Sequence, residues 1–406
     1  MLGGAGWRRL AFGSCLAALV ACSGEIDQGD PFRSGTGGVG AGGSTGDGGS
    51  GGGGASAGAG GVGGGSGGAL GGGGGGGDPI DPPPGSIPMF VAQGHAGRTI
   101  VSCDDGRSWV ADQSEEDWQY CRGRDCDHTS NAARGITWGD GWFFATFGWG
   151  TPGDVRRSRD GVAWESVLGG ANFGGIVFGN GRLVAADASG KYSDDQGDSW
   201  QDFDSVDLSV WTVRDAAFVP YGGGRFIMAA SDGGSELVVS SDGSTWLQPE
   251  SSAGCGGGLP YQGHIVYGDG VIIMTGEGGD VCRSTDGGQN WTSQSIAGSL
   301  RANGIWNGSE FMAWSYGTLY RSSDGQSWTT TPTVPGDVDF GVTAVSDAGT
   351  IVAVSNDWEQ DYENQVFYRS EDGVNWDVLP GSAFTGGHQI QVIAFGYGQP
   401  SEHCSL

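Results

Sequence analysis

Aspartates in one recurring motif are the most numerous candidates for chemistry in this chain of 406 residues. The motif reads Ser-x-Asp-(x)-Gly-x-x-Trp, and its copies lie 35 to 56 residues apart. Its seven aspartates are Asp104, Asp160, Asp195, Asp242, Asp286, Asp324 and Asp372. They could serve catalysis or bind calcium, but a carboxylate present in every repeat can also hold a turn by accepting backbone N–H bonds. We predict this structural role for all seven, because a catalytic residue need not occur seven times.

Each copy of the motif lies in a pattern of short strands. Apolar segments such as 135–138 and 142–147 precede it and are separated by Gly, Asn or Asp turns, which is typical of antiparallel hairpins. The motif Gly supplies a positive φ, and the motif Trp begins the next strand and buries a large apolar area. A unit repeated at this spacing indicates a solenoid, a propeller or an array. We expect one four-stranded antiparallel sheet per repeat.

The two ends of the repeat region predict how the array closes. The first repeat starts at 89–92 without an innermost strand before it, and one extra strand candidate, 391–396, follows the last motif. This C-terminal strand would complete the first blade and remove the open edge of the array. The sequence therefore predicts an all-β fold, a seven-bladed β-propeller over residues 87–406 without long helices.

The seven motif copies resemble the Asp-box (BNR) repeat of sialidases and many other secreted β-propellers. The resemblance implies the propeller fold and raises the possibility of glycan hydrolysis. Sialidases, however, need an arginine triad, a Tyr–Glu pair and an Arg-Ile-Pro segment, which does not occur here, and they have six blades. Seven-bladed Asp-box xyloglucanases are more similar, but they use two propellers with carboxylates facing across a cleft. A hydrolase needs two carboxylates at a defined separation, and the spacing here singles out no pair.

Three long loops predict a binding surface on the side of the ring opposite the motif turns, where propellers usually bind. They cover 113–134, 148–154 and 356–365, in blades one, two and seven, which become neighbours when the ring closes. Aromatic side chains beside carboxylates suit sugars, since flat apolar faces stack on rings and acids bind hydroxyls. The ligand-binding candidates in these loops are Trp118, Tyr120, Trp149, Trp358 and Tyr362. The alternative is that the loops are merely divergent.

Two further groups of residues could hold charged ligands. One set lies near the starts of the innermost strands, where it would surround the channel mouth: Arg134, Arg214, His264, Arg301 and His388. These residues could hold an anionic ligand such as an acidic sugar, or they could simply pair with nearby Asp and Glu. The other set is a weak candidate for calcium: Asp357, Glu359, Asp361 and Glu363. No other cofactor is indicated.

The N-terminal region predicts export and a lipid anchor. Arg8 and Arg9 precede a short apolar stretch that is too short to cross a bilayer, as in an export signal. It ends in Leu-Val-Ala-Cys, which resembles the bacterial lipoprotein cleavage site, so residues 1–21 would be the signal peptide and Cys22 the lipidated residue. Ser23 follows rather than Asp, which favours the outer membrane or the cell surface. Residues 22–86, rich in Gly and Pro, would form a disordered tether.

Charge and cysteine content narrow the partners. The formal net charge is −28, which argues against nucleic acid and against direct binding to anionic membranes. An even number of cysteines beyond Cys22 suggests disulfides in an exported protein. We predict three pairs: Cys121–Cys126, Cys255–Cys282 and Cys103–Cys404, the last closing the ring. Irregular spacing and the absence of a His cluster make zinc the weaker alternative.

The sequence as a whole favours a lipid-anchored propeller that acts as a binding or scaffold module. Its expected ligand is a glycan or a protein on the loop-rich side, and we expect a monomer. A glycoside hydrolase is the alternative function, because fold resemblance alone does not decide between the two.

Overall fold

The computed structural model describes residues 82–94, 97–113, 133–148, 153–170, 173–187, 189–208, 213–231, 235–252, 255, 265–275, 279–296, 304–336, 338–355, 365–379 and 390–405. All of them belong to the second of two compact units, Gly63–Leu406. The predicted signal peptide, Cys22 and nearly all of the predicted tether lie outside these ranges.

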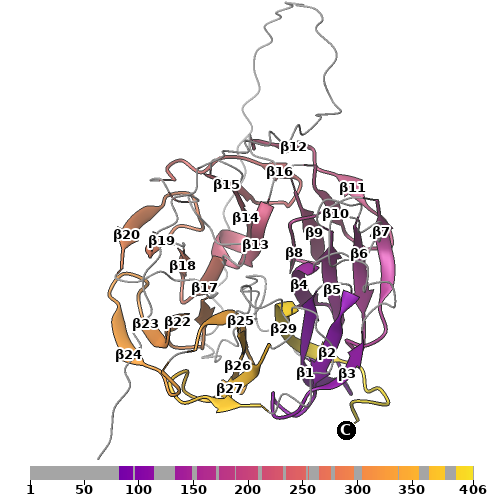
Figure 1. The fold of residues 1–406 in the computed structure, drawn as a ribbon. Helices are drawn as coiled ribbons and strands as arrows, with labels where there is room; N and C mark the ends of the chain where they lie inside the picture. Colours follow the sequence, from indigo (N-terminus) through magenta and orange to yellow (C-terminus); the bar gives the residue numbers. More distant parts are fainter. Residues whose placement is uncertain are drawn as a thin grey trace, which may run out of the picture. The chain divides into compact units, whose positions relative to one another are not determined.

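Seven antiparallel sheets form the blades (Figure 1). From the innermost strand outward, blade one consists of β29 (Ile390–Gly398), β1 (Ile87–Gly94), β2 (Thr99–Ser102) and β3 (Val110–Gln113), and blade two consists of β4 (Ala133–Gly139), β5 (Trp142–Phe147), β6 (Asp154–Ser158) and β7 (Glu165–Gly169). Blade three consists of β8 (Gly175–Gly179), β9 (Arg182–Ala186), β10 (Lys191–Ser193) and β11 (Gln201–Asp202). Blade four consists of β13 (Val213–Val219), β14 (Arg225–Ser231) and β15 (Ser235–Ser240).

The other three blades repeat the same order of strands. Blade five consists of β17 (Ile265–Gly268), β18 (Val271–Thr275), β19 (Asp280–Ser284) and β20 (Thr292–Ser295). Blade six consists of β21 (Ile305–Trp306), β22 (Phe311–Ser315), β23 (Thr318–Ser322) and β24 (Thr329–Pro332). Blade seven consists of β25 (Phe340–Val345), β26 (Ile351–Ser355), β27 (Phe367–Ser370) and β28 (Asp377–Val378). Among the elements that lie wholly within the described residues, the one helical element is the short 3-10 turn η3 (Tyr221–Gly223). The predicted all-β, seven-bladed architecture is confirmed.

Blade four differs from the other blades at its outer edge. Its sheet has three strands, and the outermost position is taken by β16 (Thr245–Trp246), which bonds in parallel to β12 (Ser205–Val206) from the connection before the blade. Leu247 still exchanges two backbone hydrogen bonds with Val239 of β15. Similar single parallel bridges join Ser251 to Asn290 and Val334 to Asn375. Segments that connect the blades thus run beside three of the motif turns.

The ring closes as the sequence predicts. Strand β29 pairs antiparallel with β1 over its whole length, from Ile87 opposite Gly398 to Gly94 opposite Ile390. The innermost strands contact one another in the order β29, β4, β8, β13, β17, β21, β25 and back to β29. The disulfide Cys103–Cys404 joins the first motif turn to the segment after β29, and Cys255–Cys282 ties the approach to blade five to β19. Both disulfides were predicted, whereas Cys121 and Cys126 lie outside the described residues.

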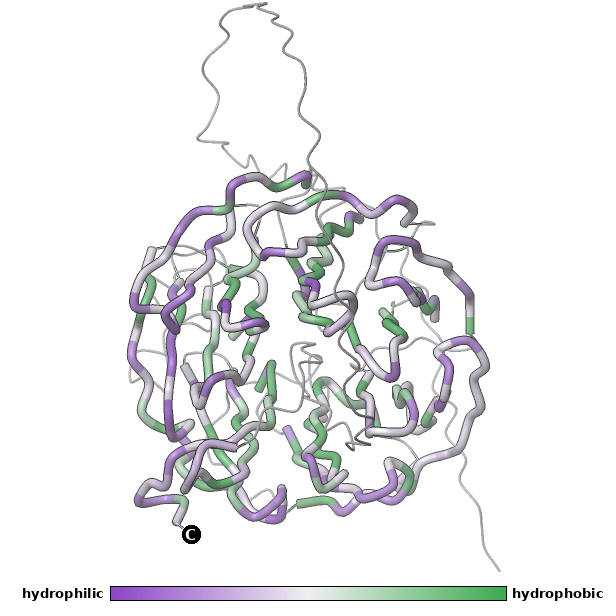
Figure 2. The backbone as a smooth tube through the Cα atoms, turned by 180° about the vertical axis from the view of Figure 1, so that it is seen from behind, coloured by the Kyte–Doolittle hydropathy of each residue, from purple (hydrophilic) through white to green (hydrophobic). Residues whose placement is uncertain are grey.

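The hydrophobic core lies between neighbouring blades. One cluster joins blades one and two through Met89 and Val91 of β1 and Ile136 and Phe143 of β4 and β5, all almost fully buried. Outermost strands such as β20 and β24 are instead mostly exposed. Figure 2 shows this as hydrophobic stretches along inner strands and hydrophilic residues along the outer edge. Because each face buries its apolar area against the next blade, the ring stabilises all seven sheets together.

Candidate functional site

The motif turns connect the third and fourth strands of the blades, and their aspartates bind the turn itself. In every copy the motif Ser hydroxyl donates to the Asp Oδ1, at 2.8 to 3.1 Å. The same oxygen accepts one or two backbone N–H groups further along the turn, as Asp324 does from Gln326 and Ser327 at 2.8 and 2.7 Å. All seven carboxylates therefore accept hydrogen bonds from their own turns.

Three turns contain one extra residue, at Asp105, Gln196 and Gly287, and all three take a positive φ, between 59° and 73°. In these turns the motif Gly N–H donates to the Ser hydroxyl four positions earlier, and in two of the shorter turns it donates three positions earlier. The insertion is thus absorbed by one left-handed residue, and the Asp hydrogen bonds are kept.

The motif glycine also sets how closely neighbouring blades approach. Gly161 of blade two has φ +72°, and an added Cβ would lie 2.7 Å from Val91 Cγ2 of blade one. Gly325 of blade six has the same relation to Ile273 Cγ2 of blade five. A larger residue at these positions would strain the backbone and push two blades apart.

Hydrogen bonds in the turns lower the pKa of several of these carboxylates, among them Asp324 and Asp195. Backbone N–H groups of Ser327 and Gln326 lower the pKa of Asp324 to about 2. The side chain and backbone of Ser199 lower the pKa of Asp195 in the same way. Such groups accept hydrogen bonds and do not donate protons at neutral pH, which is poor chemistry for a general acid.

In four blades, an arginine of the third strand bonds to the motif turn of the next blade. The sequence analysis did not predict these contacts. Arg157, Arg283, Arg321 and Arg369 each stand directly before a motif Ser. Each donates to a backbone carbonyl in the next blade's turn, as Arg283 does to Asp324 and Arg369 does to Asp105, at 2.7 and 2.9 Å. The recurrence of Arg-Ser before the motif Asp was the available signal.

Asp215 is the carboxylate whose surroundings differ most from those of the turns. It lies on β13, 5% exposed, and burial raises its pKa to about 7. Its Oδ2 accepts the backbone N–H of Ile265 in blade five at 2.7 Å, and its Oδ1 accepts the N–H of Ala216 at 2.9 Å. At the matching position of blade two stands Gly135, where an added Cβ would lie 2.9 Å from the backbone nitrogen of Ile176. Asp215 thus bridges a wider gap between blades four and five.

Only two of the predicted ligand-binding residues fall within the described residues. Arg134 and Arg214 occupy equivalent places, second in β4 and second in β13, and both are half-buried. In each strand the pairing register skips this residue, which marks a β-bulge. The remaining candidates lie outside the described ranges: Trp118, Tyr120, Trp149, His264, Arg301, Trp358, Tyr362, His388 and the acidic set Asp357, Glu359, Asp361 and Glu363.

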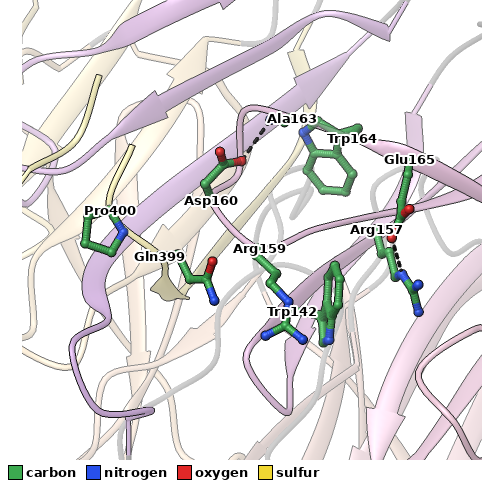
Figure 3. A pocket seen from close by; sticks show the side chains of 9 residues that line it. All are labelled: Trp142, Arg157, Arg159, Asp160, Ala163, Trp164, Glu165, Gln399 and Pro400. Carbon is green, nitrogen blue, oxygen red and sulfur yellow. Dashed lines mark hydrogen bonds and ion pairs between the residues drawn. The ribbon is translucent and has the colours of Figure 1, made fainter. Parts of the chain in front are cut away.

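A pocket lies on the motif-turn side, where blade two meets the C-terminal segment (Figure 3). Its volume is about 320 Å³, and it is lined by Trp142, Arg157, Arg159, Asp160, Ala163, Trp164, Glu165, Gln399 and Pro400. The backbone N–H of Gln399 donates to the carbonyl of Arg159 at 2.7 Å, so two distant segments form one wall. Sequence reasoning placed no site here, since no spacing relates positions 159 and 399.

Neither a metal centre nor a membrane span is found in the part of the chain that the structure describes. No group of three or more His, Cys, Asp or Glu is arranged there to hold a metal ion. No helix there is long and apolar enough to cross a bilayer.

Comparisons with known proteins give distant likenesses to other propellers. No protein-family model matches the chain, and a search of curated proteins finds no relative. The fold is similar to that of YCF48 from Cyanidioschyzon merolae, with 14% identity, a TM-score of 0.45, and coverage of 65% of this chain and 94% of that one. A protein of unknown function from Desulfotomaculum acetoxidans has 8% identity and a TM-score of 0.49, covering 78% and 100%.

A glycoside hydrolase of the GH74 type is also among the similar structures. This Niastella koreensis enzyme has 15% identity and a TM-score of 0.30, and the match covers 73% of this chain and 60% of the enzyme. At these identities the likenesses concern the fold alone.

Proposed function

We propose that this chain is an exported, lipid-anchored propeller of the Asp-box type that acts as a binding or scaffold module. Cys22 would carry the lipid, and the outer membrane or cell surface would be its location. A glycan or a protein would bind on the side opposite the motif turns, around Arg134 and Arg214. The repeated Ser–Asp hydrogen bond in all seven turns supports the kinship with Asp-box propellers.

The observation that favours binding over hydrolysis is that eight carboxylates accept hydrogen bonds from the protein itself. Glycoside hydrolysis needs two carboxyl groups roughly 5 to 9.5 Å apart, one of them with a raised pKa. The seven turn aspartates are engaged by the turns, and Asp215, whose pKa is raised, accepts one backbone N–H on each oxygen. These eight carboxylates hold parts of the fold together. This role supports a ring that binds a ligand on its surface rather than one that hydrolyses it.

The decisive experiment exposes the purified full-length chain, with its disulfides intact, to a panel of neutral and acidic polysaccharides. Binding and reducing-end release are measured on the same samples. We expect binding of at least one glycan without release. Release that a single Asp or Glu substitution abolishes would make the protein a glycoside hydrolase and overturn the proposal.

Variants on the loop side locate the ligand. Arg134→Gln and Arg214→Gln should each weaken binding of an acidic glycan about tenfold, since each removes a charge-assisted hydrogen bond. Arg107→Gln is the matched control, because the Arg107 side chain is 60% exposed in the first motif turn. Equal losses in all three variants would indicate a general charge effect rather than a site.

The anchor has its own test. Cys22→Ser removes the residue that would carry the acyl chains, so the variant should move from the membrane fraction to the soluble fraction. A membrane association that persists in the variant would contradict the lipid anchor and leave the binding proposal intact.

A further inference from the structure

The pocket beside blade two contains an arginine, Arg159, that forms no ion pair with the other residues that line it. Arg159 is exposed, and its guanidinium Cζ lies 4.0 Å from the ring centroid of Trp142. Among the described residues it forms no ion pair, because the neighbouring Asp160 accepts hydrogen bonds from the turn instead. The chain as a whole carries a formal net charge of −28, so this cation lies in a strongly acidic protein.

A second arginine of the pocket provides the contrast. Arg157 lies on the opposite side of the Trp142 ring, with its Cζ 4.5 Å from the ring centroid (Figure 3). It pairs with Glu165 at 2.7 Å and with Asp198 at 2.8 Å. The two guanidiniums thus share one indole, but of the two only Arg157 forms ion pairs within the part of the chain that the structure describes.

The stacking of Arg159 prepares it for an anion. A guanidinium that lies on an aromatic face keeps its N–H edge available, and that edge matches a carboxylate with two parallel hydrogen bonds. The indole also limits the rotamers that Arg159 can adopt, which lowers the entropy lost on binding. The geometry therefore favours a carboxylate at this edge.

The rest of the lining indicates what carries that carboxylate. The Trp164 indole N–H is used by the carbonyl of Gly161 at 3.0 Å, so its ring contributes an apolar surface. The exposed Gln399 amide can donate and accept, and the Glu165 carboxylate, 58% exposed, can accept. A multiply charged anion would be repelled by Glu165 and Asp160, whereas hydroxyl groups would find partners.

We propose that this pocket binds an acidic sugar residue bearing a single carboxylate, of the uronic acid type. Arg159 pairs with the carboxylate and the ring lies against Trp164. Gln399 and Glu165 bind hydroxyl groups. A volume of about 320 Å³ accommodates one sugar ring rather than an oligosaccharide. This site lies on the motif-turn side, so it is distinct from the loop-side surface of the proposed function and stands or falls separately.

The test is calorimetric titration of the full-length protein with D-glucuronate and D-galacturonate. D-Glucose and D-galactose test the need for the carboxylate, and acetate tests the need for the ring. We expect the uronates to bind about tenfold more tightly than either neutral sugar or acetate, since the charged contact and the ring contact both contribute. Equal affinity for the neutral sugars, equal affinity for acetate, or no binding of uronates would each overturn the proposal.

Two variants place the ligand in this pocket. Arg159→Gln should weaken uronate binding about tenfold, because it removes the charge that pairs with the carboxylate. Gln399→Ala should weaken binding several-fold, because it removes the amide that bonds a hydroxyl group. The backbone N–H of Gln399 still bonds to the carbonyl of Arg159, so the segment keeps its place in this variant. Arg107→Gln, an exposed arginine of another motif turn, is the control and should bind as the unmodified chain does. Thermal unfolding of each variant checks that the fold is kept. Unchanged uronate affinity in a folded Arg159→Gln protein overturns the assignment, whatever the loop-side variants show.

Discussion

The turn aspartates and Asp215 carry the same functional group in opposite surroundings. Asp324 lies in a solvent-accessible turn, where backbone N–H groups from the next few residues lower its pKa to about 2. Asp215 lies between two blades, and burial raises its pKa to about 7 although it also accepts two N–H bonds. Hydrogen bonding thus outweighs burial at Asp324, whereas burial outweighs hydrogen bonding at Asp215.

The motif turns recur in every blade, whereas the contacts of Asp215 and the ring-closing disulfide each occur once. Each motif turn is built by residues that are close neighbours in the sequence, so it forms wherever the motif stands. Asp215 and the disulfide Cys103–Cys404 join segments 50 and 301 residues apart. We expect the loss of a single-copy contact to cost more stability than the loss of one turn, and the predictions that follow test this ranking.

The largest expected effect concerns the disulfide that closes the ring. Replacing both Cys103 and Cys404 by Ala should lower the free energy of unfolding by on the order of 5 kcal/mol, because the unfolded chain gains the entropy of a very long loop. Replacing Cys255 and Cys282, which are only 27 residues apart, should cost about 3 to 4 kcal/mol. Urea unfolding of both variants measures the difference, and equal costs would contradict the entropic explanation.

Removing the Asp215 carboxyl should have the next largest effect. Asp215→Ala leaves the buried N–H of Ile265 without its acceptor and opens a small cavity, so we expect a loss of about 2 to 3 kcal/mol at pH 5. Urea unfolding at that pH measures it, where Asp215 is protonated in the folded state. Asp207→Ala, an exposed aspartate nearby, is the control and should change stability by less than about 0.5 kcal/mol.

Asp215 should make the free energy of unfolding decrease as the pH rises. Because its pKa is about 7 in the folded state, against an ordinary value of 3.8 in the unfolded chain, the folded protein retains a proton that the unfolded chain releases. Its contribution is fully present below pH 3.8 and is lost as the pH rises through 7, with a slope of up to about 1.4 kcal/mol per pH unit. Asp215→Asn should remove this slope between about pH 4 and 7, whereas Asp207→Asn should keep it. An unchanged slope in Asp215→Asn would show that Asp215 is ionised throughout.

The fold could be predicted because its devices repeat. Seven motif copies with strands between them lead directly to seven blades, and the missing first strand predicts the pairing of 391–396 with β1. The disulfide Cys103–Cys404 followed from that closure, since both cysteines then belong to blade one. The Arg-Ser pairs, such as Arg283-Ser284, carry a periodic signal as well, although the contact they make with the next blade is visible only in three dimensions.

The single-copy contacts could not be predicted in the same way. Asp215 has no counterpart in blade two, where Gly135 stands, and its partner Ile265 donates a backbone group that no residue type reveals. The pocket combines Arg159 with Gln399, which meet only because the ring closes. The loop residues proposed to bind a ligand, apart from Arg134 and Arg214, lie outside the described residues, so their placement stays a prediction.

The smallest effect is expected in a single motif turn. Asp324→Asn keeps the shape of the side chain but removes its charge, so the turn N–H bonds weaken by about 1 kcal/mol in total, since solvent screens the site. The pKa of Asp324 is lowered to about 2, so its contribution is present above pH 3.8 and lost as the pH falls through 2, opposite in sign to that of Asp215. Urea unfolding at pH 7 and pH 3 measures both, with Ser323→Ala as the control from the same turn. A loss larger than that of Asp215→Ala would reverse the ranking, because one of seven local turns would then matter more than a contact between blades.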